Sequence, residues 1–511
     1  MQNTYTKNYI KIYFWQGVSL VLNFLSMFIV VPYLTSEPTI YGIYSVCISF
    51  SIFLAYADLG FMGAGQKYAA EYFAKGDEAN EIKVIGFSIF ILLIFLGLFS
   101  VGFFILSQQP EILVKGINTA TQHKIASLLL LILAIFTPTT LLQRLLQMIF
   151  GIRMEDFIVQ RTNILGSIIK IISVLWFFKK GNYDIVGYFL FTQVVNFVIT
   201  VIALYIAKKK YNYNFKFLFY SIRFSKEIFK KTKGLAFASL FITISWILYY
   251  ELDSVAIGKI LGANQVAIYA IGLTVLSFFR SILGILFSPF NVRFNHFVGI
   301  GDENALKSFY LQIVSILAPV VVFPILVIAI LSSSIVLTWV GNDYLQSIEV
   351  VQCLVLCNIF AFVTYPTNSM LIAKEKQKVL YFVNALLPFV FWTGIVFTVN
   401  FLGVKSFAIF KLVAFLVSAL FLLRLMIIYL ELDLLTAIKK IFVPMFLPVL
   451  ILIMTAFFIR SYLPHEKSKM NLLIVALVMG CLIIMAFIIQ FFSSRNFRMQ
   501  IFKTIGWEGK L

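Results

Sequence analysis

Three cationic side chains lie within long apolar stretches of the sequence. Arg280 lies in the middle of the run 265–289, Lys170 in the middle of 157–178, and Arg144 toward the end of 125–150. A charge at such a depth costs about 2.5–3.5 kcal/mol on insertion scales, so it usually faces a cavity or a partner. Because arginine and lysine donate strongly to anionic oxygens, such as those of phosphate, these residues are candidates for binding an anionic substrate. A structural ion pair, for Arg280 with Asp58, is the alternative.

Acidic side chains are fewer at this depth. Asp58 lies in the run 40–64, and Glu251 and Asp253 lie near the end of 234–257, close to Lys259. They are candidates for ion coupling or gating, and a helix cap or local ion pair is the alternative for Glu251 and Asp253. A carrier of cationic compounds would need buried carboxylates, so the excess of buried cations favours an anionic substrate.

Polar and aromatic side chains share helix faces in two of the apolar runs. Gln16 and Asn23 lie on one face of 10–31 together with two serines, and Trp246 and Tyr250 lie on one face of 234–257. Amides can bind hydroxyl groups and aromatic rings can stack on sugar rings, so these four residues are candidates for contacts with a polar substrate. Ordinary packing is the alternative for each aromatic ring.

The elements that carry these residues are membrane-spanning helices. Hydrophobic residues make up 61% of the 511 and charged residues 12%, and a span needs about 20 apolar residues. The sequence therefore predicts an all-α polytopic membrane protein with about 14 transmembrane helices. The expected spans are 10–31, 40–64, 84–106, 125–150, 157–178, 183–207, 234–257, 265–289, 309–331, 346–371, 379–400, 406–430, 441–460 and 472–492.

The lysines and arginines that give the net charge of +19 are unevenly distributed between the loops on the two sides of the membrane. With the N-terminus inside, 28 of the 41 lysines and arginines lie in inner segments, nine in outer loops and four within spans. This asymmetry is the positive-inside pattern, so both termini are expected to be cytoplasmic. The basic charge is therefore assigned to topology and to anionic membrane lipids, and no nucleic-acid partner is expected.

An internal repeat divides the chain. Ile43-Tyr44 recurs as Ile268-Tyr269, and Gly76-Asp77-Glu78 recurs as Gly301-Asp302-Glu303, both at an offset of 225. The repeat predicts two homologous six-helix bundles, with substrate between them. The expected domains are the first bundle, 1–207; a basic amphipathic cytoplasmic linker, 208–233; the second bundle, 234–430; and two extra transmembrane helices with a tail, 431–511.

The N-terminal motif resembles a known family. The stretch Pro32-Tyr-Leu-Thr-Ser-Glu-Pro-Thr-Ile-Tyr-Gly-Ile-Tyr-Ser45, followed by Ala57-Asp58-Leu59-Gly60, resembles the Wzx-type O-antigen and polysaccharide flippases of the multidrug/oligosaccharidyl-lipid/polysaccharide (MOP) exporter superfamily. The resemblance implies a MATE-like pair of six-helix bundles around a cavity. It also implies outward movement of undecaprenyl-diphosphate-linked oligosaccharide, an O-antigen or capsule repeat unit, across the bacterial inner membrane by alternating access.

Other classes of function are less consistent with the sequence. It has no Gly-x4-Gly-Lys-Ser/Thr loop and no cluster of metal ligands, so neither an enzyme nor a protein with a cofactor or metal is expected. The alternative is a related exporter of the same superfamily, either a peptidoglycan-precursor flippase or a multidrug exporter. A polysaccharide polymerase and glycosyltransferases are the protein partners that fit the flippase interpretation.

Overall fold

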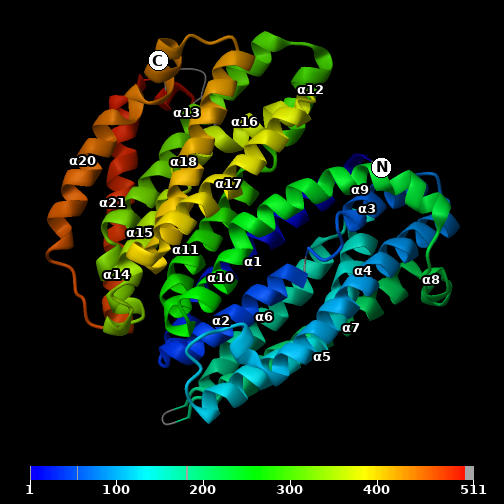
Figure 1. Ribbon diagram of the computed structural model, residues 1–511. Helices are drawn as coiled ribbons and strands as arrows, with labels where there is room; N and C mark the ends of the chain where they lie inside the picture. Colours follow the sequence, from blue (N-terminus) through cyan, green and yellow to red (C-terminus); the bar gives the residue numbers. More distant parts are fainter. Residues whose placement is uncertain (1, 55, 180–181, 496, 501–511) are drawn as a thin grey trace. The chain divides into compact units, whose positions relative to one another are not determined.

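The computed structural model describes residues 2–54, 56–179, 182–495 and 497–500 (Figure 1). Within these ranges the regular structure is helical, and twelve helices are long and apolar enough to cross a membrane. The pair α15 (Ser347–Leu356) and α16 (Ala361–Ala373), bent by 43°, raises the number to thirteen. The predicted span 40–64 begins with the shorter apolar helix α2 (Pro38–Leu54). The predicted all-α membrane fold is thus confirmed, and each expected span corresponds to a helix or an interrupted helix.

Contacts group the chain into two compact units, Met1–Ala267 and Ile268–Leu511. The first unit contains α9 (Lys226–Trp246), which packs on α3 (Phe61–Ala74), and α10 (Leu252–Ile260), which packs on α2. The predicted domains follow the sequence repeat, and the second predicted bundle begins at residue 234, earlier than the division after Ala267 that the contacts give. Because contact and repeat are different criteria, the division at 207, 233 and 430 stays a prediction.

The first unit is built around α5 (Ala120–Ile152), which contacts α2, α3, α4 and α7. The side chains that α5 directs between its neighbours are therefore held by several helices at once. The remaining elements of this unit are α1 (Gln2–Leu34), α4 (Glu78–Gln108), η1 (Pro110–Ile112), α6 (Phe157–Phe177), α7 (Ile185–Tyr211), α8 (Phe215–Ser221) and η2 (Ile247–Glu251).

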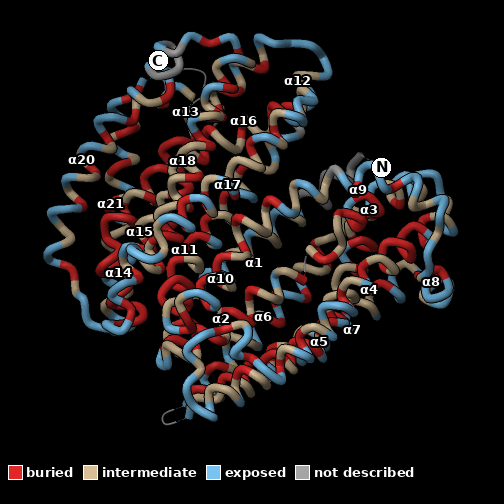
Figure 2. The backbone as a smooth tube through the Cα atoms, viewed as in Figure 1, coloured by how far each residue is buried: buried red, intermediate tan, exposed pale blue. Residues whose placement is uncertain are grey.

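The second unit is built around α13 (Glu303–Ile330), which contacts α15, α16, α20 and α21. In the most apolar 18-residue stretch of α13, 67% of the residues are buried. In the corresponding stretch of α21 (Lys469–Ser493), 17% are buried. Figure 2 shows α20 (Val443–Arg460) mostly in the colours of exposed and intermediate residues, as expected for a helix whose apolar side chains face lipid. The other elements are α11 (Ala263–Phe287), α12 (Phe290–Ile300), α14 (Ser332–Trp339), η3 (Asn342–Tyr344), α17 (Gln377–Leu402), α18 (Val404–Tyr429) and α19 (Leu434–Ile441).

The Asp-Leu-Gly part of the N-terminal motif forms the turn between α2 and α3. Gly60 has a φ of 80° and is the N-cap of α3, a conformation that glycine adopts without strain. A Cβ at this position would lie 2.5 Å from the carbonyl oxygen of Ala236 on α9. Asp58 Oδ2 accepts a hydrogen bond from the amide of Met62 at 3.0 Å. Aspartate and glycine are thus required here for the helix start and for the close approach of α9.

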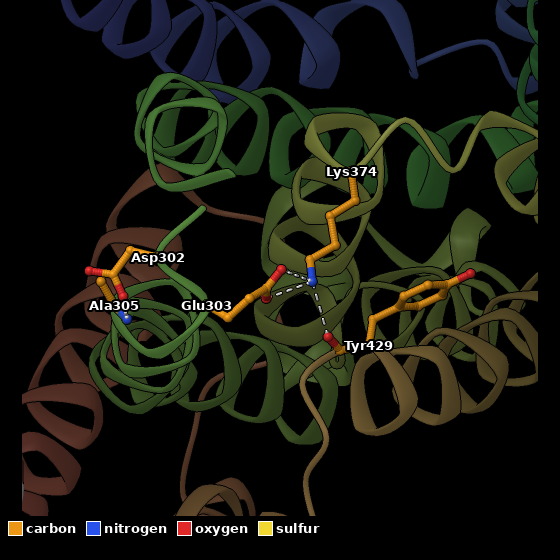
Figure 3. A network of polar contacts seen from close by, with 5 residues as sticks. All are labelled: Asp302, Glu303, Ala305, Lys374 and Tyr429. Carbon is orange, nitrogen blue, oxygen red and sulfur yellow. Dashed lines mark hydrogen bonds and ion pairs between the residues drawn. The ribbon is translucent and has the colours of Figure 1, made fainter. Parts of the chain in front are cut away.

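The two units repeat the same local structure at the starts of α4 and α13. Gly76 and Gly301 have φ values of 72° and 78°. Asp77 accepts from the amide of Asn80 at 3.1 Å, and Asp302 accepts from the amide of Ala305 at 2.9 Å (Figure 3). In Asp77 this bond lowers the pKa of the carboxyl. The motif found at an offset of 225 therefore caps a membrane-spanning helix in both units.

A second repeated feature joins the loops at the same ends of these helices. Arg153 Nη2 lies 2.9 Å from Glu81 Oε1 in the first unit. Lys374 Nζ lies 2.7 Å from Glu303 Oε2 in the second and also donates to the carbonyl of Tyr429 at 3.3 Å (Figure 3). The residues after the two cations, at positions 154 and 375, have φ values of 54° and 55°. An ion pair thus ties the start of α4 to the loop after α5 in the first unit, and the start of α13 to the loop after α16 in the second.

The two ion pairs should differ strongly in their effect on stability. Glu81 is 1% exposed, whereas Glu303 is 66% exposed. Arg153→Met leaves a buried carboxylate without its partner, which costs about 3–5 kcal/mol. Lys374→Met, the matched control, removes a pair whose acid is solvated, which costs under about 1 kcal/mol. Thermal unfolding in detergent should show a large fall for the first variant and a small one for the second. Equal losses would contradict this account.

Candidate functional site

The first unit contains a polar cavity of about 280 Å³ between α5, α6 and α7. Lys170 is the one titratable side chain among the twelve described residues that line it. A water molecule takes about 30 Å³ of liquid, so the cavity has the volume of about nine waters. The lining residues are Gln143, Leu146, Gln147, Val159, Thr162, Asn163, Ser167, Lys170, Asn196, Ile199, Thr200 and Ala203.

Helical spacing directs the polar side chains into this cavity. Asn163, Ser167 and Lys170 are separated by four and three residues, so they lie on one face of α6. Asn196 and Thr200 have the same spacing on α7. The opposite face of α6 exposes apolar side chains, among them Leu165, Ile172 and Trp176. The polar stripe therefore points into the unit and the apolar stripe points out of it.

Lys170 is held by a single side chain from the neighbouring helix. Its Nζ donates to Asn196 Oδ1 at 2.5 Å. Among the described residues this is the hydrogen bond that the structure gives to the ammonium group, which has three donors. The hydroxyls of Ser167 and Thr200 donate to backbone carbonyls within their own helices. The cavity therefore offers a cation with donors to spare, surrounded by amides that can donate or accept.

Arg144 lies beside the cavity and is linked to it through Gln147. Its Nη1 donates to Gln147 Oε1 at 2.9 Å. Arg144 stands eight residues before the end of α5 at Ile152, about 12 Å along the helix. Its charge also interacts with the carboxylate of Asp58. The structure therefore places Arg144 next to Gln147, which lines the cavity that holds Lys170, and the charge of Arg144 acts on Asp58.

The remaining predicted residues of the first unit lie outside this cavity. Gln16 is half-buried and Asn23 is exposed on α1. Trp246 stacks on Tyr250, with ring centroids 4.4 Å apart, where α9 passes into the π-helical η2. π-Helical turns are frequent at functional sites. The described lining of the cavity includes none of these four residues.

Glu251 and Asp253 are both buried in the same region. They lie at the end of η2 and the start of α10. Asp253 Oδ1 accepts from the amide of Ser254 at 2.8 Å. Among the described residues, no three His, Cys, Asp or Glu side chains gather as a metal site would require. The two acids are therefore held within the packed part of the unit.

Arg280 belongs to the second unit, where it is half-buried on α11. Ser277, Ser281 and Gly284 on the same side of this helix are exposed, and a Cβ added at Gly284 would meet no atom within 4 Å. The charge of Arg280 also acts on the hydroxyl of Tyr365 on α16. Arg280 thus lies beside an open face of small side chains.

Sequence reasoning missed Asn196 and Thr200, which complete the cavity. The signal was available, because two polar residues four apart in an apolar run share a face. Only the packing of α6 against α7, however, shows that this face meets Lys170.

Comparison with known proteins decides the family. Residues 6–291, more than half of the chain, match the family described as "Polysaccharide biosynthesis protein". The chain belongs to this family. Both segments of the N-terminal motif lie within the matched residues, so the resemblance seen in the sequence is confirmed at the level of the family. No curated protein matches the chain.

Solved structures show the fold of this polysaccharide biosynthesis family member. The lipid II flippase MurJ in an inward closed conformation has a TM-score of 0.69 at 13% identity, covering 95% of this chain and 99% of that one. An inward-facing multidrug resistance MATE transporter of the MOP superfamily has a TM-score of 0.63 at 15% identity, covering 81% and 94%. A MOP superfamily transporter from Pyrococcus furiosus has a TM-score of 0.53 at 14% identity, covering 85% and 97%. The fold is therefore that of the MOP superfamily.

Proposed function

We propose that this chain is a flippase for undecaprenyl-diphosphate-linked oligosaccharides, such as O-antigen or capsule repeat units. The observation that carries the proposal is the cationic cavity of the first unit, with Lys170 inside it and Arg144 beside it. A diphosphate needs cationic and amide donors along its path, and these are what the cavity offers. The membership in a polysaccharide biosynthesis family supports the oligosaccharide as the attached group.

The size of the cavity suggests how the substrate is divided among the residues. About 280 Å³ accommodates a diphosphate with a few waters but not an oligosaccharide. We assign the diphosphate to Lys170 and Arg144 in the first unit and to Arg280 in the second. Gln16, Asn23, Trp246 and Tyr250 are assigned to the glycan.

Movement of the substrate would then follow alternating access, with one bundle rocking against the other. Asp58, Glu251 and Asp253 are the acids assigned to ion coupling or gating. The charge of Arg144 acts on the carboxylate of Asp58, which supports the assignment of this acid. No catalytic residue, cofactor or metal has a role in this proposal. Glycosyltransferases would build the substrate before this protein transports it, and a polysaccharide polymerase would act on the substrate after transport.

A peptidoglycan-precursor flippase is the second candidate, because the fold is shared with the lipid II flippase MurJ over 95% of this chain. Both candidate substrates carry a lipid-linked diphosphate, so the cavity suits either. A multidrug exporter fits less well, since the titratable group in the cavity is a cation.

Complementation separates the candidates: we expect the gene to restore surface glycan in a strain that lacks its oligosaccharide flippase. Rescue only of a strain that lacks its peptidoglycan-precursor flippase would favour the second candidate.

The proposed topology places both termini on the cytoplasmic side of the inner membrane. Reporters fused after Lys231 and after Arg498 should read cytoplasmic, and a reporter near Lys115 should read external. The reason is the distribution of 28 basic residues in inner segments and nine in outer loops. Reporter activity and protease protection in spheroplasts measure this. An external reading at Lys231 would invert the topology.

A further inference from the structure

The basic segment, residues 208–233, carries nine lysines and arginines and a single acid, Glu227. All nine cations are exposed. In the described part of the chain, seven of them have no protein partner: Lys208, Lys209, Lys216, Arg223, Lys226, Lys230 and Lys233. So many unneutralised charges on a short segment predict an anionic partner outside the protein.

The other two cations fix the segment to the first unit. Lys210 Nζ lies 2.5 Å from Glu155 Oε2 in the loop between α5 and α6. Lys231 Nζ donates to the hydroxyl of Tyr72 on α3 at 3.1 Å and lies 4.4 Å from the centre of its ring. The segment is therefore held at both ends against the body of the unit, with its charges outward.

The short helix α8 within this segment has two different faces. Leu218 and Ser221 are buried where α8 packs on α4, and a Cβ at Gly86 on α4 would meet the Ser221 carbonyl oxygen at 2.5 Å. On the other face Phe219 and Tyr220 are 74% and 67% exposed, and Lys216 is exposed beside them. α8 thus presents two aromatic rings and a cation away from the protein.

The position of the segment between two spans indicates where this face lies relative to the membrane. The span of α7 ends at Tyr211, and the next span begins at Ser239. The segment therefore leaves one span and enters the next on the same side of the membrane, so its two ends lie at the level of the lipid headgroups. Aromatic rings and lysines prefer this layer, because it accepts an apolar body beside a polar or charged tip. A soluble polyanion would instead leave the rings without an apolar neighbour.

We propose that the basic segment is a docking surface for anionic phospholipid headgroups of the adjacent leaflet. Phe219 and Tyr220 lie among the headgroups, and the seven unpaired cations gather anionic lipid around them. α8 packs on α4, and residues 226–233 of the segment form the start of α9, so lipid bound here would lie against two helices of the first unit. This role does not depend on what the protein transports.

Quenching of tryptophan fluorescence by brominated lipid tests the proposal. Tyr220→Trp in the full chain is reconstituted in phosphatidylcholine vesicles that contain either brominated phosphatidylglycerol or brominated phosphatidylcholine at equal fractions. The signal of the unsubstituted protein is subtracted. We expect quenching by the anionic brominated lipid to exceed that by the zwitterionic one severalfold, and high salt to reduce the difference.

Two further variants serve as controls. Tyr205→Trp, at an exposed position within the span of α7, should be quenched equally by both lipids. Adding Lys216→Gln, Arg223→Gln and Lys226→Gln to Tyr220→Trp removes three of the seven cations and should clearly reduce the headgroup preference while leaving thermal unfolding unchanged. Equal quenching of Tyr220→Trp by the two lipids would overturn the proposal. Quenching by aqueous iodide with none by either lipid would also overturn it and would favour a soluble acidic partner.

Discussion

Lys170→Met should lose most of its export of lipid-linked oligosaccharide while remaining in the membrane. The variant keeps the length and apolar stem of the side chain but removes the ammonium that Asn196 holds in the cavity. A hydrogen bond to a charged group contributes about 1.5–3 kcal/mol, so the rate should fall roughly 10- to 100-fold. Surface glycan in a complemented flippase-deficient strain measures this, normalised to the amount of protein in the membrane.

Two variants make the result specific. Lys170→Arg should retain part of the activity, because it keeps the charge with a different donor geometry. Arg424→Met removes another cation within a span, one that is exposed on α18, and should export normally. If Lys170→Met exports as well as the unchanged protein at equal abundance, the cavity has no role in holding the diphosphate.

Arg280→Ala should reduce surface glycan to a similar extent through the second unit. The guanidinium lies beside the open face formed by Ser277, Ser281 and Gly284, so a substrate phosphate could reach it without moving a packed side chain. Arg280→Lys should restore part of the activity, since the charge remains while the bidentate fork is lost. The measurement is the same complementation, with membrane abundance followed in parallel.

The structural alternative for Arg280 gives a different outcome. If Arg280→Ala is absent from the membrane, the arginine serves mainly in an ion pair that stabilises the fold. If the variant is present and exports normally, Arg280 has no essential part in substrate binding. If both cations act on one diphosphate, the double variant Arg280→Ala with Lys170→Met should lose less activity than the two single losses combined.

The sequence predicts the membrane fold and part of the candidate site. The cost of a charge in lipid is enough to single out Lys170 and Arg144, and the motif Gly-Asp-Glu identifies two helix starts with the same cap. These features depend on residues close together in the chain. Local chemistry and hydropathy are enough to predict them.

Features that depend on packing between helices could not be predicted in this way. Asn196 contacts Lys170 across 26 residues of sequence, and the charge of Arg144 on α5 acts on Asp58, which precedes α3. The predicted continuous span 346–371 is interrupted at 357–360, where Cys357-Asn-Ile-Phe contains neither proline nor glycine. The break is therefore not marked by either of the usual helix breakers; the two helices that it separates both pack on α13 and α18.

The most direct test of the account is translocation by the purified protein. The full chain is reconstituted in vesicles that carry undecaprenyl-diphosphate-linked oligosaccharide in the inner leaflet, and a membrane-impermeant glycosidase reports the glycan that reaches the outside. The account predicts that the accessible fraction rises with time, and that Lys170→Met slows this rise roughly 10- to 100-fold. Movement of a lipid-linked peptidoglycan precursor or a cationic drug, with none of the oligosaccharide, would contradict it.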